Sequence, residues 1–427
     1  MSQGRLLVAC DFGTTMFRAL ATEIGPGGQL EVVGCAQEKA EGFHDGDFVD
    51  LATGSRCIAR VMRALEADCD IYVTGFTYSI SGSHLRSVRA TAQVPIGPGP
   101  RPIRPADVEE VRGRARTMGI PFDHKILTVT PVEFAVDRVR GVVDPVGRVG
   151  SQLEIQAHLI TGSRSVLHNI ENAVETAKYR PLAEEVDVLA AGEALVTRAE
   201  REEGAMLVDV GGHATTWAVY RKGAVVASGS VPLGGHHLSN DLAHGLRVPL
   251  EEAEKVKRLR GVVLRSLVDA VPVEVLFEEE RPEETPGIVA AILEPRFEEI
   301  LAHVKKDFGD RRELSRLAAG VILTGGGSRC RGSAQLCEEI FDLPTECRWL
   351  PPGLRGADRL PKGQWATVVG LSLCVARDTV EAADAVGPRG TGPGLLGRLR
   401  GMLRRDRPRD GDQDEGDGAG RAAAARA

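Results

Sequence analysis

The stretch Leu6-Leu-Val-Ala-Cys10, followed by Asp11-Phe-Gly-Thr-Thr15, joins an apolar run to a turn that contains an acid, a glycine and two hydroxyl residues. A similar join occurs much later in the chain, at Met206-Leu-Val-Asp-Val-Gly-Gly-His-Ala-Thr215. After each turn come a second strand-like run, a short turn and a third run, which is the pattern of a three-stranded meander. Because the pattern occurs twice, the sequence predicts a duplicated, two-lobed α/β fold.

The two turns are predicted phosphate-binding loops. Glycine lets the backbone approach a phosphate closely and point its N–H groups at it. An Asp cannot bind phosphate directly, but it can hold the Mg²⁺ that accompanies phosphate, here through bound water. The predicted metal residues are Asp11 and Asp209. The predicted phosphate-binding residues are Asp11, Gly13, Thr14 and Thr15 in the first loop and Asp209, Gly211, Gly212 and Thr215 in the second.

Two further segments complete a predicted nucleotide site. An apolar strand from Gly320 runs into three glycines, Gly325, Gly326 and Gly327, which suits close contact with a nucleotide. Glu254 and Lys257 lie one turn apart on a predicted helix over residues 250–259 and share a face. Taken singly, a glycine turn is commonly only a turn, and a Glu–Lys pair is commonly solvated. The occurrence of all four segments in this order favours a clamp for ATP with Mg²⁺.

Longer stretches match a known family over about Arg5 to Arg377. They are Ser81-Gly-Ser-His84, residues 129–137, Asp144-Pro-Val-Gly147, His158-Leu-Ile-Thr161, Leu293-Glu-Pro-Arg-Phe297 and residues 321–327. In these stretches the chain resembles the actin and heat-shock-chaperone ATPase superfamily and, within it, the FtsA family of bacterial cell-division proteins. The resemblance implies an actin-like two-lobed ATPase fold of duplicated ribonuclease-H-like halves, with an inserted small α+β subdomain and a C-terminal amphipathic helix.

The expected division of the chain follows the two meanders and the block between them. We expect a first lobe at residues 1–80, the inserted subdomain at 81–162, the second lobe at 163–235, its helical subdomain at 236–310, its end with the adenosine-side glycine loop at 311–383, a linker at 384–394, an amphipathic helix at 395–405 and a disordered tail at 406–427.

The resemblance also implies a function. Members of the family bind ATP, polymerise on the cytoplasmic face of the inner membrane at the division septum, tether the FtsZ ring and recruit other divisome proteins. Arg296 and Glu299 match family positions implicated in binding the C-terminal peptide of FtsZ, although a structural surface pair would have the same spacing. The alternatives are a pilus-assembly adaptor of the same fold, which predicts no amphipathic tail, and a sugar-kinase-like phosphotransferase, which needs a catalytic base.

The second loop departs from the family pattern. His213 stands where a third glycine is usual, and Thr216 replaces the second Asp of the strict superfamily pattern. His213 can crowd a phosphate or donate a hydrogen bond to it. No residue is assigned to orient a water for hydrolysis. This includes Asp187, which lies near the position at which some relatives have an acid. We therefore expect at most a slow ATPase.

Composition excludes other classes. A formal charge of −7 and a pI of about 5.9 argue against nucleic acid as a main partner. The eight cysteines show no C-x-x-C spacing, which predicts reduced, buried thiols and no cysteine metal site. The sequence shows no signal-peptide pattern and no apolar run of membrane-spanning length, so we expect a protein that is neither exported nor membrane-spanning.

A short C-terminal segment has the pattern of an interfacial membrane helix. Its apolar residues recur at helical spacing with arginines between them, which suits an anionic membrane surface, although the same face could dock on the body of the protein. The preceding Gly/Pro-rich linker and the arginine density favour the membrane. The predicted membrane-binding residues are Leu395, Leu396, Leu399, Met402 and Leu403 on the apolar face, with Arg398, Arg404 and Arg405 beside them.

Leu399 lies at the centre of this face, so Leu399→Glu places a charge where acyl chains are expected. We expect the substitution to abolish co-sedimentation with anionic liposomes and to leave ATP binding unchanged. Deleting residues 410–427 is the matched control, since none of them extends the apolar face, and this truncation should still bind. Liposome binding that persists after removal of residues 394–427 would contradict the assignment.

Overall fold

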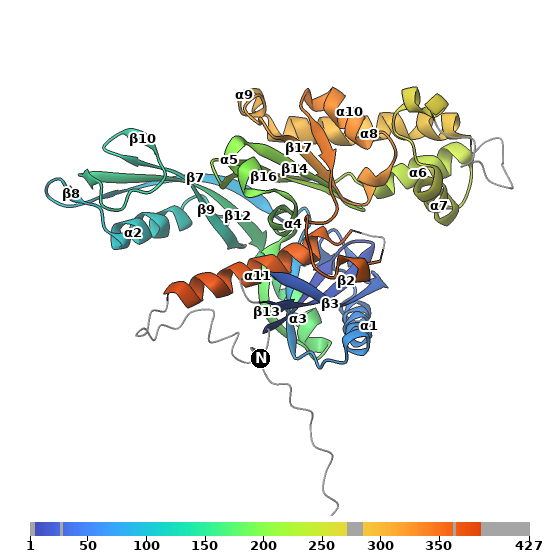
Figure 1. The fold of residues 1–427 in the computed structure, drawn as a ribbon, viewed down its shortest axis with the longest axis horizontal. Helices are drawn as coiled ribbons and strands as arrows, with labels where there is room; N and C mark the ends of the chain where they lie inside the picture. Colours follow the sequence, from blue (N-terminus) through green and yellow to red (C-terminus); the bar gives the residue numbers. More distant parts are fainter. Residues whose placement is uncertain (1–4, 26–28, 271–284, 362–363, 386–427) are drawn as a thin grey trace, which may run out of the picture.

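The computed structural model describes residues 5–25, 29–270, 285–361 and 364–385. Two lobes stack one above the other, and a third unit projects from one side of them (Figure 1). The predicted amphipathic helix at residues 395–405, the tail at 406–427 and most of the linker lie outside the described residues. None of the helices in the described ranges is long and apolar enough to cross a membrane.

The first lobe is built on a five-stranded sheet in the order β13-β6-β1-β2-β3. The first three strands in the chain form the predicted antiparallel meander, and β6 and β13 extend the sheet in parallel beyond β1. Residues 164–186 therefore lie in the first lobe, and not in the second lobe that the sequence led us to expect from residue 163. Helices α1 and α3 pack on the sheet together with a short hairpin, β4–β5. The elements are β1 (Arg5–Phe12), β2 (Met16–Ile24), β3 (Leu30–Lys39), β4 (Phe43–His44), β5 (Asp47–Phe48), α1 (Leu51–Cys69), β6 (Gly75–Ile80), α3 (Arg164–Thr176) and β13 (Arg180–Val186).

The second lobe repeats this sheet. Its strand order is β16-β15-β14-β17-β18, again an antiparallel meander extended by two parallel strands. Asp11 and Asp209 are each the penultimate residue of the first meander strand. The duplicated two-lobed fold predicted from the sequence is therefore confirmed. The strands are β14 (Ala205–Val210), β15 (Thr215–Arg221), β16 (Ala224–Val231), β17 (Gly320–Thr324) and β18 (Thr345–Cys347).

Helices complete the second lobe. Three of them, α6, α7 and α8, gather at one end of the lobe (Figure 1), and the apolar faces of α6 and α8 pack with those of β15 and β16 in one core. The predicted helix over residues 250–259 is α7. The elements are α5 (Arg198–Glu203), α6 (Gly235–Leu246), α7 (Leu250–Arg260), the 3₁₀ helix η1 (Arg265–Ala270), α8 (Pro286–Phe308), α9 (Arg311–Leu314), η4 (Gly327–Arg329), α10 (Ser333–Phe341) and η5 (Ala357–Arg359).

The projecting unit has a sheet and a core of its own. Its four-stranded sheet runs in the order β10-β9-β12-β7, and α2 packs on it. Burial alternates along β7 and at the start of β12, as it does in a strand that packs one face on a core. The elements are β7 (Arg86–Pro95), β8 (Arg101–Pro102), α2 (Pro105–Arg116), β9 (His124–Val136), β10 (Val139–Val142), β11 (Val149–Gly150) and β12 (Gln152–Ser163).

Two helices lie between the lobes, α4 (Asp187–Leu195) and α11 (Ala366–Ala385). They share one apolar cluster with residues of both five-stranded sheets. The helices cross so closely that a Cβ atom on Gly370 would lie 1.7 Å from the carbonyl oxygen of Ala190. This crossing sets the distance between the two sheets, and with it the width of the space between the two acid-containing turns.

Candidate functional site

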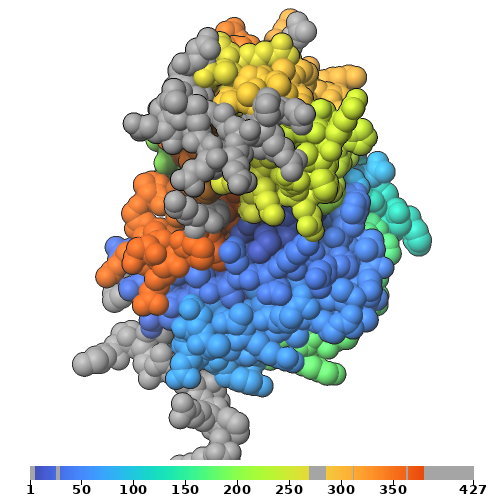
Figure 2. Space-filling model, turned by 90° about the vertical axis from the view of Figure 1, so that its right-hand side faces the viewer, coloured from blue at the N-terminus to red at the C-terminus, as the bar shows by residue number. Residues whose placement is uncertain are grey.

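The two predicted phosphate loops face each other at the junction of the lobes. A Cβ atom on Gly212 of the second loop would lie 2.8 Å from Thr14 Oγ1 and 2.7 Å from Thr15 Cγ2 of the first loop. The opposing surfaces are in contact in the space-filling view, where α6 and α7 in yellow-green rest on the blue first lobe (Figure 2). The structure therefore brings together two loops that the sequence places far apart.

Each loop is a tight hairpin that only glycine permits. A Cβ on Gly13 would lie 2.7 Å from the carbonyl oxygen of Met16, and one on Gly211 would lie 2.7 Å from that of Ala214. Contacts this short exclude a side chain at either position. The Gly211 N–H donates to Ala214 O at 3.0 Å within its own hairpin, so an anion between the lobes would have to bind other N–H groups of the two tips.

The second loop is fixed to the start of α6. The Gly235 N–H donates to Gly211 O at 2.8 Å, and the His236 N–H donates to Gly212 O at 2.7 Å. The Thr215 hydroxyl donates to Leu233 O at 2.7 Å. Thr215 therefore holds the loop in place through the backbone that precedes α6.

Glu254 and Lys257 approach the same place from α7. Lys257 Nζ donates to Gly235 O, Ser239 Oγ and Glu254 Oε2, each at 2.7 Å. Lys257 is only 9% exposed, so the pair is not a solvated surface pair. A Cβ on Gly235 would lie 3.5 Å from Lys257 Nζ and 3.6 Å from Gly327 Cα, so α7 and the glycine loop meet at the first turn of α6.

The triple glycine lies directly behind the second loop. Gly325 has a φ of +89°, and a Cβ there would lie 2.3 Å from Asp209 Oδ1. A Cβ on Gly327 would lie 2.4 Å from Val210 Cγ1, whereas Gly326 has more room beside Gln364. Glycine is needed here because β17 and β14 are neighbours and the chain must turn against the end of β14.

Three carboxyl groups gather behind the loops, from Asp11, Asp209 and Asp187. Burial raises the pKa of Asp209 to about 7, and the nearby charge of Asp11 adds to this. Burial, followed by the charge of Asp209, raises the pKa of Asp187 well above its usual range. Burial also raises the pKa of Asp11, against the opposing effects of Arg18 and of the Ser79 hydroxyl, which donates to Asp11 Oδ1 at 2.8 Å.

Sequence reasoning left Asp187 unassigned. It is the first residue of α4, directly after β13, and its carboxylate lies 3.5 Å from the Thr216 hydroxyl. Thr216 is paired across the hairpin with Asp209. No local pattern distinguishes Asp187 from any other acid in the first turn of a helix. Only the packing of α4 between the lobes brings it to the other two acids.

These residues fit Mg²⁺ and a phosphate chain. Three partly buried acids that repel one another favour a cation among them, and oxygen ligands suit Mg²⁺. Within the described ranges, no group of three or more His, Cys, Asp or Glu side chains is placed to hold a metal ion by itself. Phosphate oxygens and water would therefore have to complete the coordination of a bound Mg²⁺.

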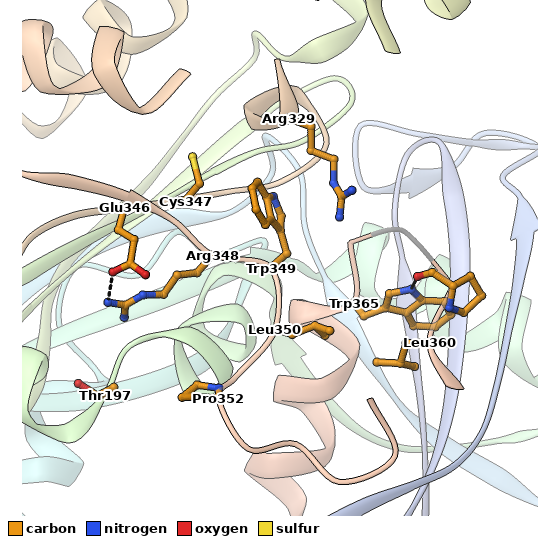
Figure 3. A pocket seen from close by; sticks show the side chains of 11 residues that line it. Thr197, Arg329, Glu346, Cys347, Arg348, Trp349, Leu350, Pro352, Leu360 and Trp365 are labelled. Carbon is orange, nitrogen blue, oxygen red and sulfur yellow. Dashed lines mark hydrogen bonds and ion pairs between the residues drawn. The ribbon is translucent and has the colours of Figure 1, made fainter. Parts of the chain in front are cut away.

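A cavity of 680 Å³ opens beside the glycine loop (Figure 3). Arg329 lies at its edge, with its guanidinium group 5.1 Å from the ring centroid of Trp349. Trp365 and Leu360 form the opposite wall. At the far end, Arg348 is held by Glu200 at 2.7 Å and by Glu346 at 2.6 Å. The cavity therefore has aromatic walls close to Arg329, two residues after Gly327, and such walls suit a flat apolar group such as a base.

Arg296 and Glu299 lie on one face of α8, as predicted, and form an ion pair. Arg296 also donates to both carboxylate oxygens of Asp241 on α6, at 2.6 and 3.2 Å. Arg296 is therefore a bridge between α6 and α8 that remains partly exposed.

Known family models match the second lobe and the projecting unit of this sequence. A family model described as "Cell division protein FtsA" matches residues 206–370, and a model described as "SHS2 domain inserted in FTSA" matches residues 82–161. The cell division protein FtsA of Neisseria meningitidis serogroup B is 30% identical over 409 residues, which cover 93% of this chain and 98% of that protein. FtsA of Escherichia coli strain K12 is 30% identical over 378 residues, which cover 86% of this chain and 89% of that protein.

The chain belongs to the FtsA family. Membership makes it an actin-like protein of cell division, and the projecting unit is the inserted SHS2 domain. Solved structures agree on the fold. The PilM–PilN type IV pilus biogenesis complex matches with a TM-score of 0.61 at 17% identity, over 87% of this chain and 98% of that one. MreB5 of Spiroplasma citri bound to ADP matches with a TM-score of 0.51 at 13% identity, over 90% and 99%.

The buried acids give this FtsA-family protein a testable pH dependence. An acid with a higher pKa in the folded state binds more protons when folded, so its stabilising effect is present at low pH and is lost as the pH rises through the folded pKa. For Asp209 that value is about 7. We expect the nucleotide-free protein to lose thermal stability as the pH rises from about 4, the ordinary pKa of an aspartate, to about 7. Asp209→Asn should reduce this loss and raise the melting temperature at pH 8 by about 2 °C or more.

Asp342→Asn is the matched control for that measurement. Asp342 is an exposed residue in the left-handed conformation at the end of α10, a position that Asn tolerates. The control should leave the pH profile unchanged. An identical profile for wild type and Asp209→Asn would show that Asp209 is not the group that titrates.

Proposed function

We propose that this FtsA-family protein binds ATP with Mg²⁺ between its two lobes and acts in cell division as a membrane-bound adaptor. One observation supports the nucleotide site above the others. Two glycine hairpins touch across the lobes, and three mutually repelling, partly buried acids lie behind them. Such an arrangement is unfavourable unless a cation and an anion occupy the space together.

Each residue has a distinct proposed role. The backbone N–H groups around Gly13 and Gly211, with the hydroxyls of Thr14 and Thr15, bind the phosphate chain from opposite sides. Asp11 and Asp209 hold Mg²⁺ through water. Lys257 and Glu254 contact the ribose. The loop Gly325–Gly327 and the Trp349 wall of the cavity contact the adenine.

We propose at most slow hydrolysis. Asp187 is the acid that the packing adds to the site, but burial keeps its pKa raised, and a protonated carboxyl cannot accept a proton from water. A bound cation favours its ionised form. Turnover would then depend on how completely the lobes close around the ligand.

The remaining roles concern partners. We propose that the helix at residues 395–405 attaches the protein to the anionic cytoplasmic face of the inner membrane at the septum. Self-association into filaments would multiply these helices and strengthen a weak attachment. The helical part of the second lobe, with Arg296 and Glu299, would bind the C-terminal peptide of FtsZ, and the adaptor would recruit other divisome proteins.

Lys257→Ala tests the nucleotide site. Removing a buried charged donor should weaken MgATP binding by about tenfold or more, measured by titration calorimetry. Lys255→Ala on the same helix is the matched control, because Lys255 is exposed, and it should bind as the wild type does. Asp11→Ala should remove the part of the affinity that depends on Mg²⁺, seen by comparing titrations with and without a chelator. Unchanged MgATP affinity in both Lys257→Ala and Asp11→Ala would exclude the site.

Arg296→Glu tests the FtsZ contact. The substitution reverses the charge on the exposed side of α8 and should weaken binding of the FtsZ C-terminal peptide, measured by fluorescence anisotropy, by about tenfold. Because it also breaks the bridge to Asp241, melting temperatures of all variants are compared. Arg316→Glu is the control, since it disrupts another Arg–Glu pair of the same lobe, with Glu313. Intact peptide affinity in Arg296→Glu would place the contact on another surface.

A further inference from the structure

Three histidine rings from three separate elements meet at the phosphate loops. The ring of His213, in the second loop, stacks on that of His236 in the first turn of α6, with centroids 4.8 Å apart and planes inclined by 26°. His44, at the end of β4 in the first lobe, meets the other side of His213 edge-on at 4.9 Å. His44, His213 and His236 are called the histidine stack below. It is a contact between side chains of opposite lobes.

Each ring is held in place by firm structure. Phe43 and Phe48 flank the hairpin that carries His44, and their rings pack on Phe12 and Phe17, which flank the first phosphate loop, at centroid distances of 5.5–6.3 Å. The backbone of His236 is bonded to Gly212. His213 directly follows Gly212, where the second loop touches the first. The stack therefore lies one residue from the predicted path of the phosphate chain.

One nitrogen of the central ring lacks a hydrogen-bond partner among the described residues. His213 Nδ1 is buried and has no hydrogen bond within the described part of the chain. A buried nitrogen left without a partner is unfavourable, so it is suited to a ligand that supplies one. The nitrogen belongs to a loop whose backbone already suits an anion.

The surroundings disfavour the protonated forms of His213 and His236 before a ligand binds. Burial lowers the pKa of His213, and the rings of His236, His44 and His237 lower it further, with only Asp45 acting in the opposite direction. Burial likewise lowers the pKa of His236, followed by His237 and Lys257, against Glu254. A phosphate group beside the rings would reverse this, because an opposite charge favours the protonated imidazole.

We propose that the histidine stack binds the last phosphate of the nucleotide, with His213 donating from Nδ1, so that the protein prefers a nucleoside triphosphate to a diphosphate. The inference depends on the proposed nucleotide site and adds a selectivity to it. Because His44 belongs to the other lobe, the contact also requires the lobes to be closed.

The proposal has a direct thermodynamic consequence. If a phosphate raises the pKa of His213, binding takes up protons near pH 7, and affinity rises as the pH falls towards the free-state pKa. Mg²⁺ held by Asp11 and Asp209 has the opposite effect, since a cation there makes these carboxyl groups and that of Asp187 release protons. The carboxyl groups contribute equally to the binding of MgATP and of MgADP. The difference in proton uptake between the two nucleotides therefore reports on the histidines alone.

Calorimetric titration of the full-length protein with MgATP and with MgADP, at about pH 7 in two buffers of different ionisation enthalpy, measures affinity and proton uptake together. We expect the wild type to take up more protons with MgATP than with MgADP. His213→Gly should reduce the preference for ATP by about tenfold and remove this difference. His213→Asn keeps a donor near Nδ1 but cannot take up a proton, so it should retain part of the preference without the uptake.

Two further variants guard against misfolding as an explanation. His44→Gln removes the ring that the first lobe contributes to the histidine stack, and it should also lower the preference for ATP. His244→Gln, an exposed position on α6, is the control and should behave as the wild type does. An unchanged ATP-to-ADP ratio in His213→Gly, or tighter binding of both nucleotides, would overturn the proposal. A wild type that binds both nucleotides equally refutes this inference alone, whereas one that binds neither refutes the nucleotide site as well.

Discussion

The structure depends on one close contact, the crossing of α4 and α11 between the lobes. Gly370 lies against the backbone of Ala190 so closely that no side chain fits between them. Residues of both sheets pack on these two helices, so the spacing of the sheets is set there. The two phosphate loops, which extend from the sheets, meet because that spacing is small. A larger residue at this crossing would separate the loops as well as weaken the core.

The candidate site combines firm positioning with unfavourable electrostatics. Hydrogen bonds fix the second loop to α6 and Lys257 to the same turn, so the geometry does not need a ligand to form it. The carboxyl groups of Asp11, Asp187 and Asp209 nevertheless lie together and partly buried, which raises the free energy of their ionised forms. A cation with its phosphate relieves that repulsion. Binding and closure of the lobes are therefore expected to stabilise each other.

Much of this was accessible from the sequence because the signals are local. Hairpins require glycine at fixed positions, so Gly13 and Gly211 marked both loops, and the repeated meander predicted the duplicated sheets that the structure confirms. The residues that surround the loops were harder to predict from the sequence. Asp187 has no distinguishing neighbours in the sequence, and the burial of Lys257 depends on where α7 meets α6. The edge-on contact of His44 with His213 joins residues of opposite lobes, for which no local pattern exists.

By itself, the sequence determined the type of fold, the two loops and the family, because these depend on turn geometry, on hydrophobic periodicity and on stretches of matching residues. The tertiary structure alone decided which acids face one another, which ring nitrogen is left without a partner, and that Arg296 bridges two helices as well as facing solvent. The reason is physical. A pKa, a buried charge or a ring contact depends on distances between residues remote in the chain, and those distances exist only once the helices between the lobes have packed.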